Sequence, residues 1–266
     1  MLNLFLLKII VTPLLIASAT LIARRWGPAV GGWFLGLPLT SGPVSFFLAL
    51  EQGTEFAMAA AVNSLIGQCG IAAFSIIYAK SAKGTAWLRS CCLALTVYFP
   101  AMELLSLTSP NLPLACVMTF GFQLATLLII GKPTEVLTMR TSPWWDLPLR
   151  MGVALTMVLS ITGFATTLGP KWSGLLAPFP VFTLIMTTFS HQQSGPAAAH
   201  QLLYGITVGA FGGAISFFCL VALCLTRFGP LITFLLATLV SFAVNGLILT
   251  LMLRRRRPLS KSVQCP

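Results

Sequence analysis

The sequence predicts an all-helical integral membrane protein, with about nine transmembrane helices arranged as two inverted four-helix repeats joined by a central linking helix. Three observations lead to this fold class. Apolar side chains make up 57% of the 266 residues and charged ones only 8%, whereas a soluble domain usually has about a quarter of its residues charged. Long apolar runs recur along the whole chain, and the two halves of the chain align with one another.

The apolar runs divide the chain into nine expected spans, each long enough to cross about 30 Å of hydrocarbon. The first run is too long for a signal peptide and is followed by Arg24 and Arg25, so we expect it to remain as a span. Prolines interrupt the second and seventh runs, and each of these is either a broken span or a re-entrant hairpin. The expected spans are residues 4–23, 30–50, 55–79, 87–108, 112–131, 149–168, 172–190, 197–224 and 231–253.

The distribution of basic residues orients these spans. If all nine runs cross, most of the 16 lysines and arginines fall on one side of the membrane. Because basic loops stay in the cytoplasm, the N-terminus is expected outside and the C-terminus in the cytoplasm. The net charge of +11 is then a topology signal, and the basic tail is expected to meet anionic lipid headgroups, with no nucleic acid as partner. The residues on the cytoplasmic side are Arg24, Arg25, Lys80, Lys83, Arg89, Lys132, Arg140, Arg150, Arg254, Arg255, Arg256, Arg257 and Lys261.

A shift of 142 residues without a gap aligns spans one to four with spans six to nine. The fifth span has no copy, so it reverses the second half, and equivalent loops with opposite charge bias are typical of an inverted repeat. We therefore expect a first repeat at 1–110, a linking helix with a cytoplasmic loop at 111–148, a second repeat at 149–253 and a tail at 254–266. Matched residues include Gly27 and Gly169, Pro28 and Pro170, Gly32 and Gly174, Pro38 and Pro180, Gly53 and Gly195, Gly67 and Gly209, and Gly70 and Gly212.

The two interrupted spans are the candidate substrate site. Proline removes an amide donor and frees a carbonyl in the preceding turn, and discontinuous helices at the midplane hold the substrate in inverted-repeat transporters. A structural kink, satisfied by neighbouring helices, is the alternative. The candidate substrate-binding residues are Pro38, Thr40, Ser41, Gly42, Pro178, Pro180, Thr183 and the intramembrane Asn245.

Polar residues elsewhere suggest coupling and gating. Glu103 lies inside the fourth span, where a charged side chain costs at least about 2.5 kcal/mol unless it is paired, hydrated or protonated. It is the candidate proton-coupling residue, with a structural hydrogen bond as the alternative. The turns after the interrupted spans are candidate gates, although loop polarity explains them equally well; their residues are Glu51, Gln52, His191 and Gln193. We place Glu135 and Asp146 in the cytoplasmic loop.

Catalytic motifs are missing from the sequence. There is no H-E-x-x-H, G-x-S-x-G or P-loop sequence, and a single aspartate, Asp146, excludes an intramembrane aspartyl dyad. The seven cysteines lie mostly in apolar runs without C-x-x-C spacing, so we interpret them as small core residues. We expect no enzymatic activity, no cofactor and no metal.

The segment Phe179-Pro180-Val181-Phe182-Thr183-Leu184, with the following helix that contains Gly205 and Gly209, resembles the GlpM-like small bacterial inner-membrane proteins. This resemblance implies a bacterial inner membrane and adds no substrate. The overall plan is similar to compact inverted-repeat carriers such as the drug/metabolite transporters. The sequence favours a secondary transporter of a small metabolite, an ion or a lipid-linked substrate, and a homodimer is one option for its assembly. The alternative is a non-transporting scaffold or regulatory subunit of a partner complex.

Overall fold

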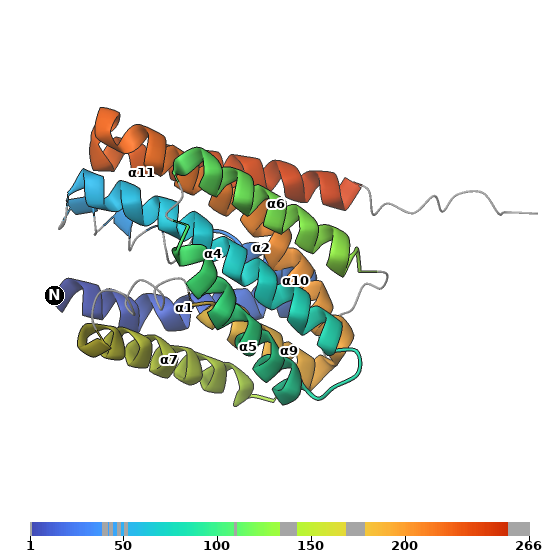
Figure 1. The fold of residues 1–266 in the computed structure, drawn as a ribbon. Helices are drawn as coiled ribbons and strands as arrows, with labels where there is room; N and C mark the ends of the chain where they lie inside the picture. The colour runs from blue at the N-terminus through green and yellow to red at the C-terminus, as the bar shows by residue number, and fades with distance from the viewer. Residues whose placement is uncertain are drawn as a thin grey trace, which may run out of the picture.

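The computed structural model describes residues 2–38, 42, 45–46, 49–50, 53–108, 111–133, 143–168 and 179–254. All regular secondary structure in these ranges is helical, which confirms the all-α prediction. The helices form an elongated bundle (Figure 1). Five candidate site residues lie outside the described residues, namely Thr40, Ser41, Glu51, Gln52 and Pro178.

The helices follow the apolar runs closely. The chain up to the linking helix forms α1 (Leu2–Trp26), α2 (Pro28–Leu35), α4 (Thr54–Ser81), α5 (Trp87–Ser106) and α6 (Leu112–Ile130). The remainder forms α7 (Asp146–Leu168), α9 (Val181–Ser194), α10 (Pro196–Gly209), a π-helical turn η1 (Ala210–Ala214) and α11 (Ile215–Arg254). A non-helical residue, Gly229 with φ 72°, divides α11 into two arms.

Among the described residues, five segments are long and apolar enough to cross a membrane: Ile9–Trp26, Thr54–Ser81, Trp87–Leu105, Leu112–Ile130 and Pro196–Leu251. The last covers 56 residues and folds back at Gly229, so its length suffices for two crossings. Large apolar side chains project from these helices, including Leu128 at 74% and Leu239 at 68% exposure. Such a surface suits lipid and not water. The chain is a multi-pass helical membrane protein.

The helix pairs α1–α7 and α4–α10 run antiparallel. Arg24, in the last turn of α1, is bonded to Asp146, the first residue of α7, and the two helices lie side by side (Figure 1). Ala79, near the end of α4, lines the same cleft as Pro196, the first residue of α10. One end of the bundle therefore collects several basic residues, and we call it the basic end. Its described cations are Arg24, Arg25, Lys80, Lys83, Arg89, Lys132 and Arg150.

The closest helix crossing joins α2 to α10. A Cβ atom added to Gly32 would lie 2.0 Å from the carbonyl oxygen of Leu202, and one added to Gly205 would lie 2.0 Å from that of Ala29. Small residues of this kind let two backbones touch, which is a common way for membrane helices to associate. The crossing fixes the short α2 against the second half of the chain, near the interruption at Pro38.

Candidate functional site

A buried ionic cluster lies at the basic end, where α1, α7 and α9 meet. Nη2 of Arg24 donates to Oδ2 of Asp146 at 2.7 Å, and Nε of Arg150 donates to both carboxylate oxygens at 3.0 Å. The Gln193 amide also donates to Oδ1 of Asp146. The side chains of Asp146 and Arg150 are 0% exposed. We call these four residues the Asp146 cluster.

The start of α7 explains how the pair forms. Asp146 is the acidic residue in the first turn, where the helix dipole favours negative charge. Arg150 lies four residues further on, so both side chains share one face of the helix. The sequence predicts a loop at Asp146, whereas in the structure this residue begins a helix and is fully buried.

The remaining donors of Arg150 point to groups on α9. Nη2 donates to Oε1 of Gln193 at 2.9 Å, and Nη1 lies 3.5 Å from the sulfur of Met186. The guanidinium group lies over the ring of Phe189, 4.8 Å from its centre. A buried charge is tolerated only when it is paired and hydrogen-bonded. Helix α9 supplies an amide oxygen, a sulfur and an aromatic ring around the guanidinium group of Arg150. The cluster thereby attaches α9 to α1 and α7.

Asp146 stays ionised in this setting. Burial alone would raise the pKa of its carboxyl group, but the charge of Arg150 and the hydrogen bonds from Gln193, Arg150 and Arg24 outweigh burial. The pKa of Asp146 is therefore held below its usual range. The cluster contains two cations and one anion at neutral pH.

A second contact attaches α9 to α4. The hydroxyl of Tyr78 and Nδ1 of His191 share a hydrogen bond of 3.2 Å, and the two rings meet edge to face. His191 lies just beyond the seventh expected span and is 8% exposed. Burial lowers the pKa of this histidine, so the imidazole is neutral at pH 7. His191 and Gln193, both predicted as gate residues, thus connect α9 to α4 and α7.

Asn245 is a buried side chain whose amide group has unused hydrogen-bonding capacity. It is 0% exposed on α11, and neither atom of its amide group has a hydrogen bond within the described part of the chain. The amide rests on η1, since a Cβ added to Gly213 would lie 2.1 Å from its nitrogen. Burying an unpaired amide costs roughly 2–7 kcal/mol, and π-helical turns often accompany functional sites.

The other predicted site residues lie apart from the Asp146 cluster. Pro38 follows α2, and its carbonyl oxygen accepts a hydrogen bond of 2.8 Å from the amide of Gly42. Pro180 directly precedes α9, on which Thr183 is 6% exposed. Glu103 is half-buried on α5, which packs against α4 and α9, whereas Asn245 packs against η1.

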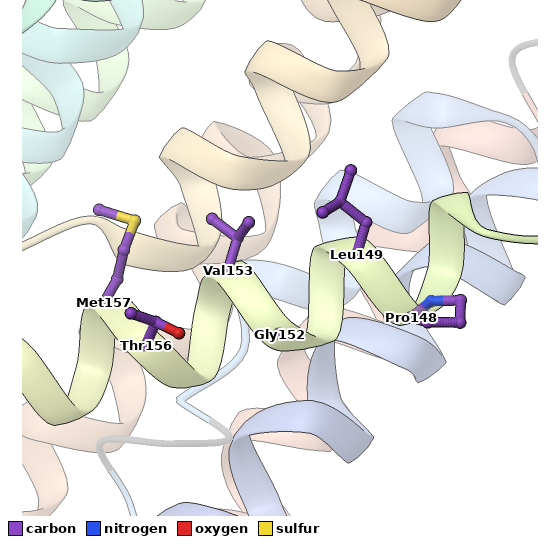
Figure 2. A pocket seen from close by; sticks show the side chains of 6 residues that line it. All are labelled: Pro148, Leu149, Gly152, Val153, Thr156 and Met157. Carbon is purple, nitrogen blue, oxygen red and sulfur yellow. The ribbon is translucent and has the colours of Figure 1, made fainter.

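Two hollows on the surface of the described residues are lined by other side chains. The first, about 350 Å³, follows α7 and has an almost wholly apolar lining, as Figure 2 shows; its residues are Pro148, Leu149, Gly152, Val153, Thr156 and Met157. The second, about 390 Å³, lies at the basic end between α4, α6 and α10. Neither is lined by Pro38 or Pro180. Within the described ranges no group of three or more His, Cys, Asp or Glu residues is arranged to hold a metal.

Neither a family model, nor a curated protein, nor a solved structure matches this chain.

The basic end contains functional candidates that sequence reasoning misses. It treats Arg24 and Arg150 only as topology signals, and nothing in the sequence singles out Tyr78. The spacing of Asp146 and Arg150 is the available signal, because an acid followed four residues later by an arginine forms a pair once the segment is helical.

Proposed function

We propose that the protein is a secondary transporter, built from two inverted repeats and working by alternating access. The observation that carries the proposal is that equivalent helices begin alike and run antiparallel. At an offset of 142 residues, Thr54 at the start of α4 pairs with Pro196 at the start of α10. The residue before each is a glycine with positive φ, 91° at Gly53 and 83° at Gly195. L side chains avoid this conformation, so the same local backbone recurs at equivalent places.

Helix packing supports the same division into halves. Gly70 on α4 lies against Met102 of α5, and its equivalent Gly212 lies against Ile248 on the second arm of α11. α1 and α7 are likewise equivalent, and their antiparallel contact is what one reversing span between two copies produces. The unpaired α6 supplies that span.

The Asp146 cluster is the inner gate of this transporter. It joins α1 of the first half to α7 and α9 of the second, while the Tyr78–His191 contact joins α9 to α4. Opening the basic end would separate these groups into water, where each charge is solvated and costs little. Hydrogen-bonded contacts of this type are rearranged when packed helices change between two discrete arrangements. The substrate lies deeper, near Pro38, Pro180 and Asn245, and Glu103 couples transport to protons.

A test that needs no known substrate is thiol accessibility. Thr183→Cys is introduced into a chain whose native cysteines are replaced by serine or alanine, and a membrane-impermeant maleimide is added to either side of oriented proteoliposomes. Asp146→Asn removes the anion of the gate, so labelling at position 183 from the basic side should rise and labelling from the opposite side should fall. Lys80→Ala, an exposed charge at the same end, should change neither.

Reciprocal change of this kind distinguishes the proposal from its alternative. A scaffold or regulatory subunit has no reason to exchange access between two sides. If Asp146→Asn leaves labelling from both sides unchanged, the gate is wrong. If labelling from the two sides does not change in opposite directions in any variant at Asp146, Gln193 or Glu103, alternating access is wrong as well.

A further inference from the structure

The cleft at the basic end combines basic and apolar side chains, and none of its lining residues belongs to the Asp146 cluster. It lies where α4 and α6 end and α10 begins, and it has a volume of about 390 Å³. The lining combines three basic side chains with apolar walls. Its residues are Ala79, Lys83, Ile130, Lys132, Pro133, Pro196, Ala197, His200 and Gln201.

Two of the lining residues carry a positive charge that no carboxylate of the described residues neutralises. Lys83 follows α4 and Lys132 follows α6, and both are exposed. The described carboxylate at this end, Asp146, is bonded to Arg24 and Arg150. Within the described part of the chain, no carboxylate lies within ion-pair distance of either lysine. The two ammonium groups are therefore available to an anion.

The start of α10 adds to the positive potential. Pro196 is the first residue of this helix and Ala197 the second, and both line the cleft. Proline has no N–H, and the amides of Ala198 and Ala199 donate to the carbonyl oxygen of Gly195, so the amide of Ala197 is the donor left for an anion at this positive end of the helix dipole. A phosphate group matches this combination of an amide and two lysines, because it offers several acceptor oxygens and negative charge.

The walls of the cleft are fixed and partly apolar. Nε2 of His200 donates to the carbonyl oxygen of Ile130 at 2.9 Å, which holds the end of α6 against α10. Ile130 itself and Pro133 form the α6 side of the cleft. The preceding turn of α6 exposes Leu128 at 74% and Ile129 at 46%, so an apolar surface leads from the bilayer to the lysines. Glycerol and the first methylenes of an acyl chain fit such a path.

From this geometry we propose that the cleft binds the phosphate group of an anionic glycerophospholipid. The bound lipid belongs to the leaflet in which the basic end lies, since basic pockets between membrane helices are the usual places for anionic headgroups. The apolar path along α6 favours a lipid over a phosphate-bearing solute of the same chemistry. The site stands whether or not the protein transports anything.

The test compares two charge-matched double variants of the full-length protein. Purified, delipidated protein is titrated with phosphatidylglycerol or phosphatidylcholine, and bound lipid is counted by native mass spectrometry. K83A/K132A should weaken phosphatidylglycerol binding by about 25-fold, because each lysine near a headgroup contributes roughly fivefold. K80A/R89A removes two exposed charges from the same end but outside the cleft, and it should leave binding unchanged. Melting temperatures show whether both variants remain folded.

The outcomes separate the two sources of phosphate. Displacement of phosphatidylglycerol by millimolar inorganic phosphate, with phosphate alone raising the melting temperature of the wild type but not of K83A/K132A, would keep the site and make its ligand a solute. Equal lipid binding by the two double variants would overturn the proposal. If K83A/K132A does not fold, the single variants Lys83→Gln and Lys132→Gln must each lower affinity, and unchanged affinity in either refutes the site.

Discussion

The two arginines of the Asp146 cluster differ in burial and in the number of their hydrogen-bond partners. Arg150 is fully buried, and its donors meet a carboxylate, an amide, a sulfur and an aromatic ring. Arg24 is 28% exposed, and its buried Nε has no acceptor within the described residues. A buried ion pair stabilises a fold weakly because desolvation offsets most of the attraction. The unequal burial of the two arginines means that Arg24 is the member of the cluster with more contact with solvent.

His191 gives the basic end a testable pH dependence. Its pKa is lowered by burial in the folded state, so the unfolded chain takes up the proton at the higher pH. The stability that this histidine contributes is full above about pH 6.5 and is lost as pH falls toward its folded pKa. We expect the melting temperature of the wild type to fall between about pH 7 and 5, and His191→Gln to remove part of that fall.

His200→Gln is the control for this prediction. His200 is half-buried at the same end and lies outside the contact with Tyr78. Identical pH profiles for wild type and His191→Gln would contradict the role assigned to burial. The contribution of Asp146 to stability does not change between about pH 7 and 5, because its pKa is lowered and it titrates at more acidic pH.

The sequence shows which residues are polar but not which residues they contact in the fold. His191 and Gln193 are recognisable as polar residues at the end of an apolar run. The burial of Asp146 is not, because it depends on Arg24, which lies 122 positions away in the sequence. No local pattern in the chain contains that contact, so only the three-dimensional packing reveals it.

At the scale of helices, the backbones of α2 and α10 lie too close together to accept a larger side chain at the crossing. Gly205→Ala places a Cβ atom 2.0 Å from the carbonyl oxygen of Ala29, so the two backbones must move apart. We expect the free energy of unfolding to fall by about 1–3 kcal/mol, the usual cost of overpacking. Thermal unfolding of the purified protein in detergent measures this loss.

Gly246→Ala is the matched control for the crossing. This glycine lies in α11, and an added Cβ meets nothing within 4 Å. Alanine there should be neutral or stabilising by up to about 1 kcal/mol, because it favours the helix over the unfolded chain. Equal effects of the two substitutions would mean that the backbones are not in contact.

Helix positions are more predictable than helix contacts. Spans expected at 55–79 and 112–131 appear as Thr54–Ser81 and Leu112–Ile130, because the length of an apolar run is set by the bilayer and glycine or proline marks its ends. The seventh run is different, since its described part begins only at Phe179. Apolar composition says nothing about which faces meet, so the α2–α10 crossing could not be foreseen.

For the molecule as a whole, the position of α6 is directly testable. The sulfur of Cys116 on α6 lies 2.9 Å from that of Cys219 on the first arm of α11. Mild oxidation with copper phenanthroline should therefore form a disulfide between these helices. Trypsin cleavage after Arg140 separates the two cysteines in the chain, so the fragments should stay joined until a reductant is added.

Two variants check this result. Cys116→Ser should abolish the cross-link, whereas Cys92→Ser, on the exposed side of α5, should not affect it. Fragments that separate without reductant after oxidation of the wild type would place α6 elsewhere in the bundle.

The π-helical turn has a consequence for the two aligned halves. The gap-free offset pairs Ala210–Ala214 with residues 68–72 of α4, which form ordinary α-helix. An i→i+5 bond encloses one residue more than an i→i+4 bond, and one residue corresponds to roughly 100° about a helix axis. Side chains beyond Ala214 are therefore turned by about one residue step from those beyond Ala72. The two aligned segments contain the same number of residues but wind differently, so the two proposed repeats differ in helix geometry at this point.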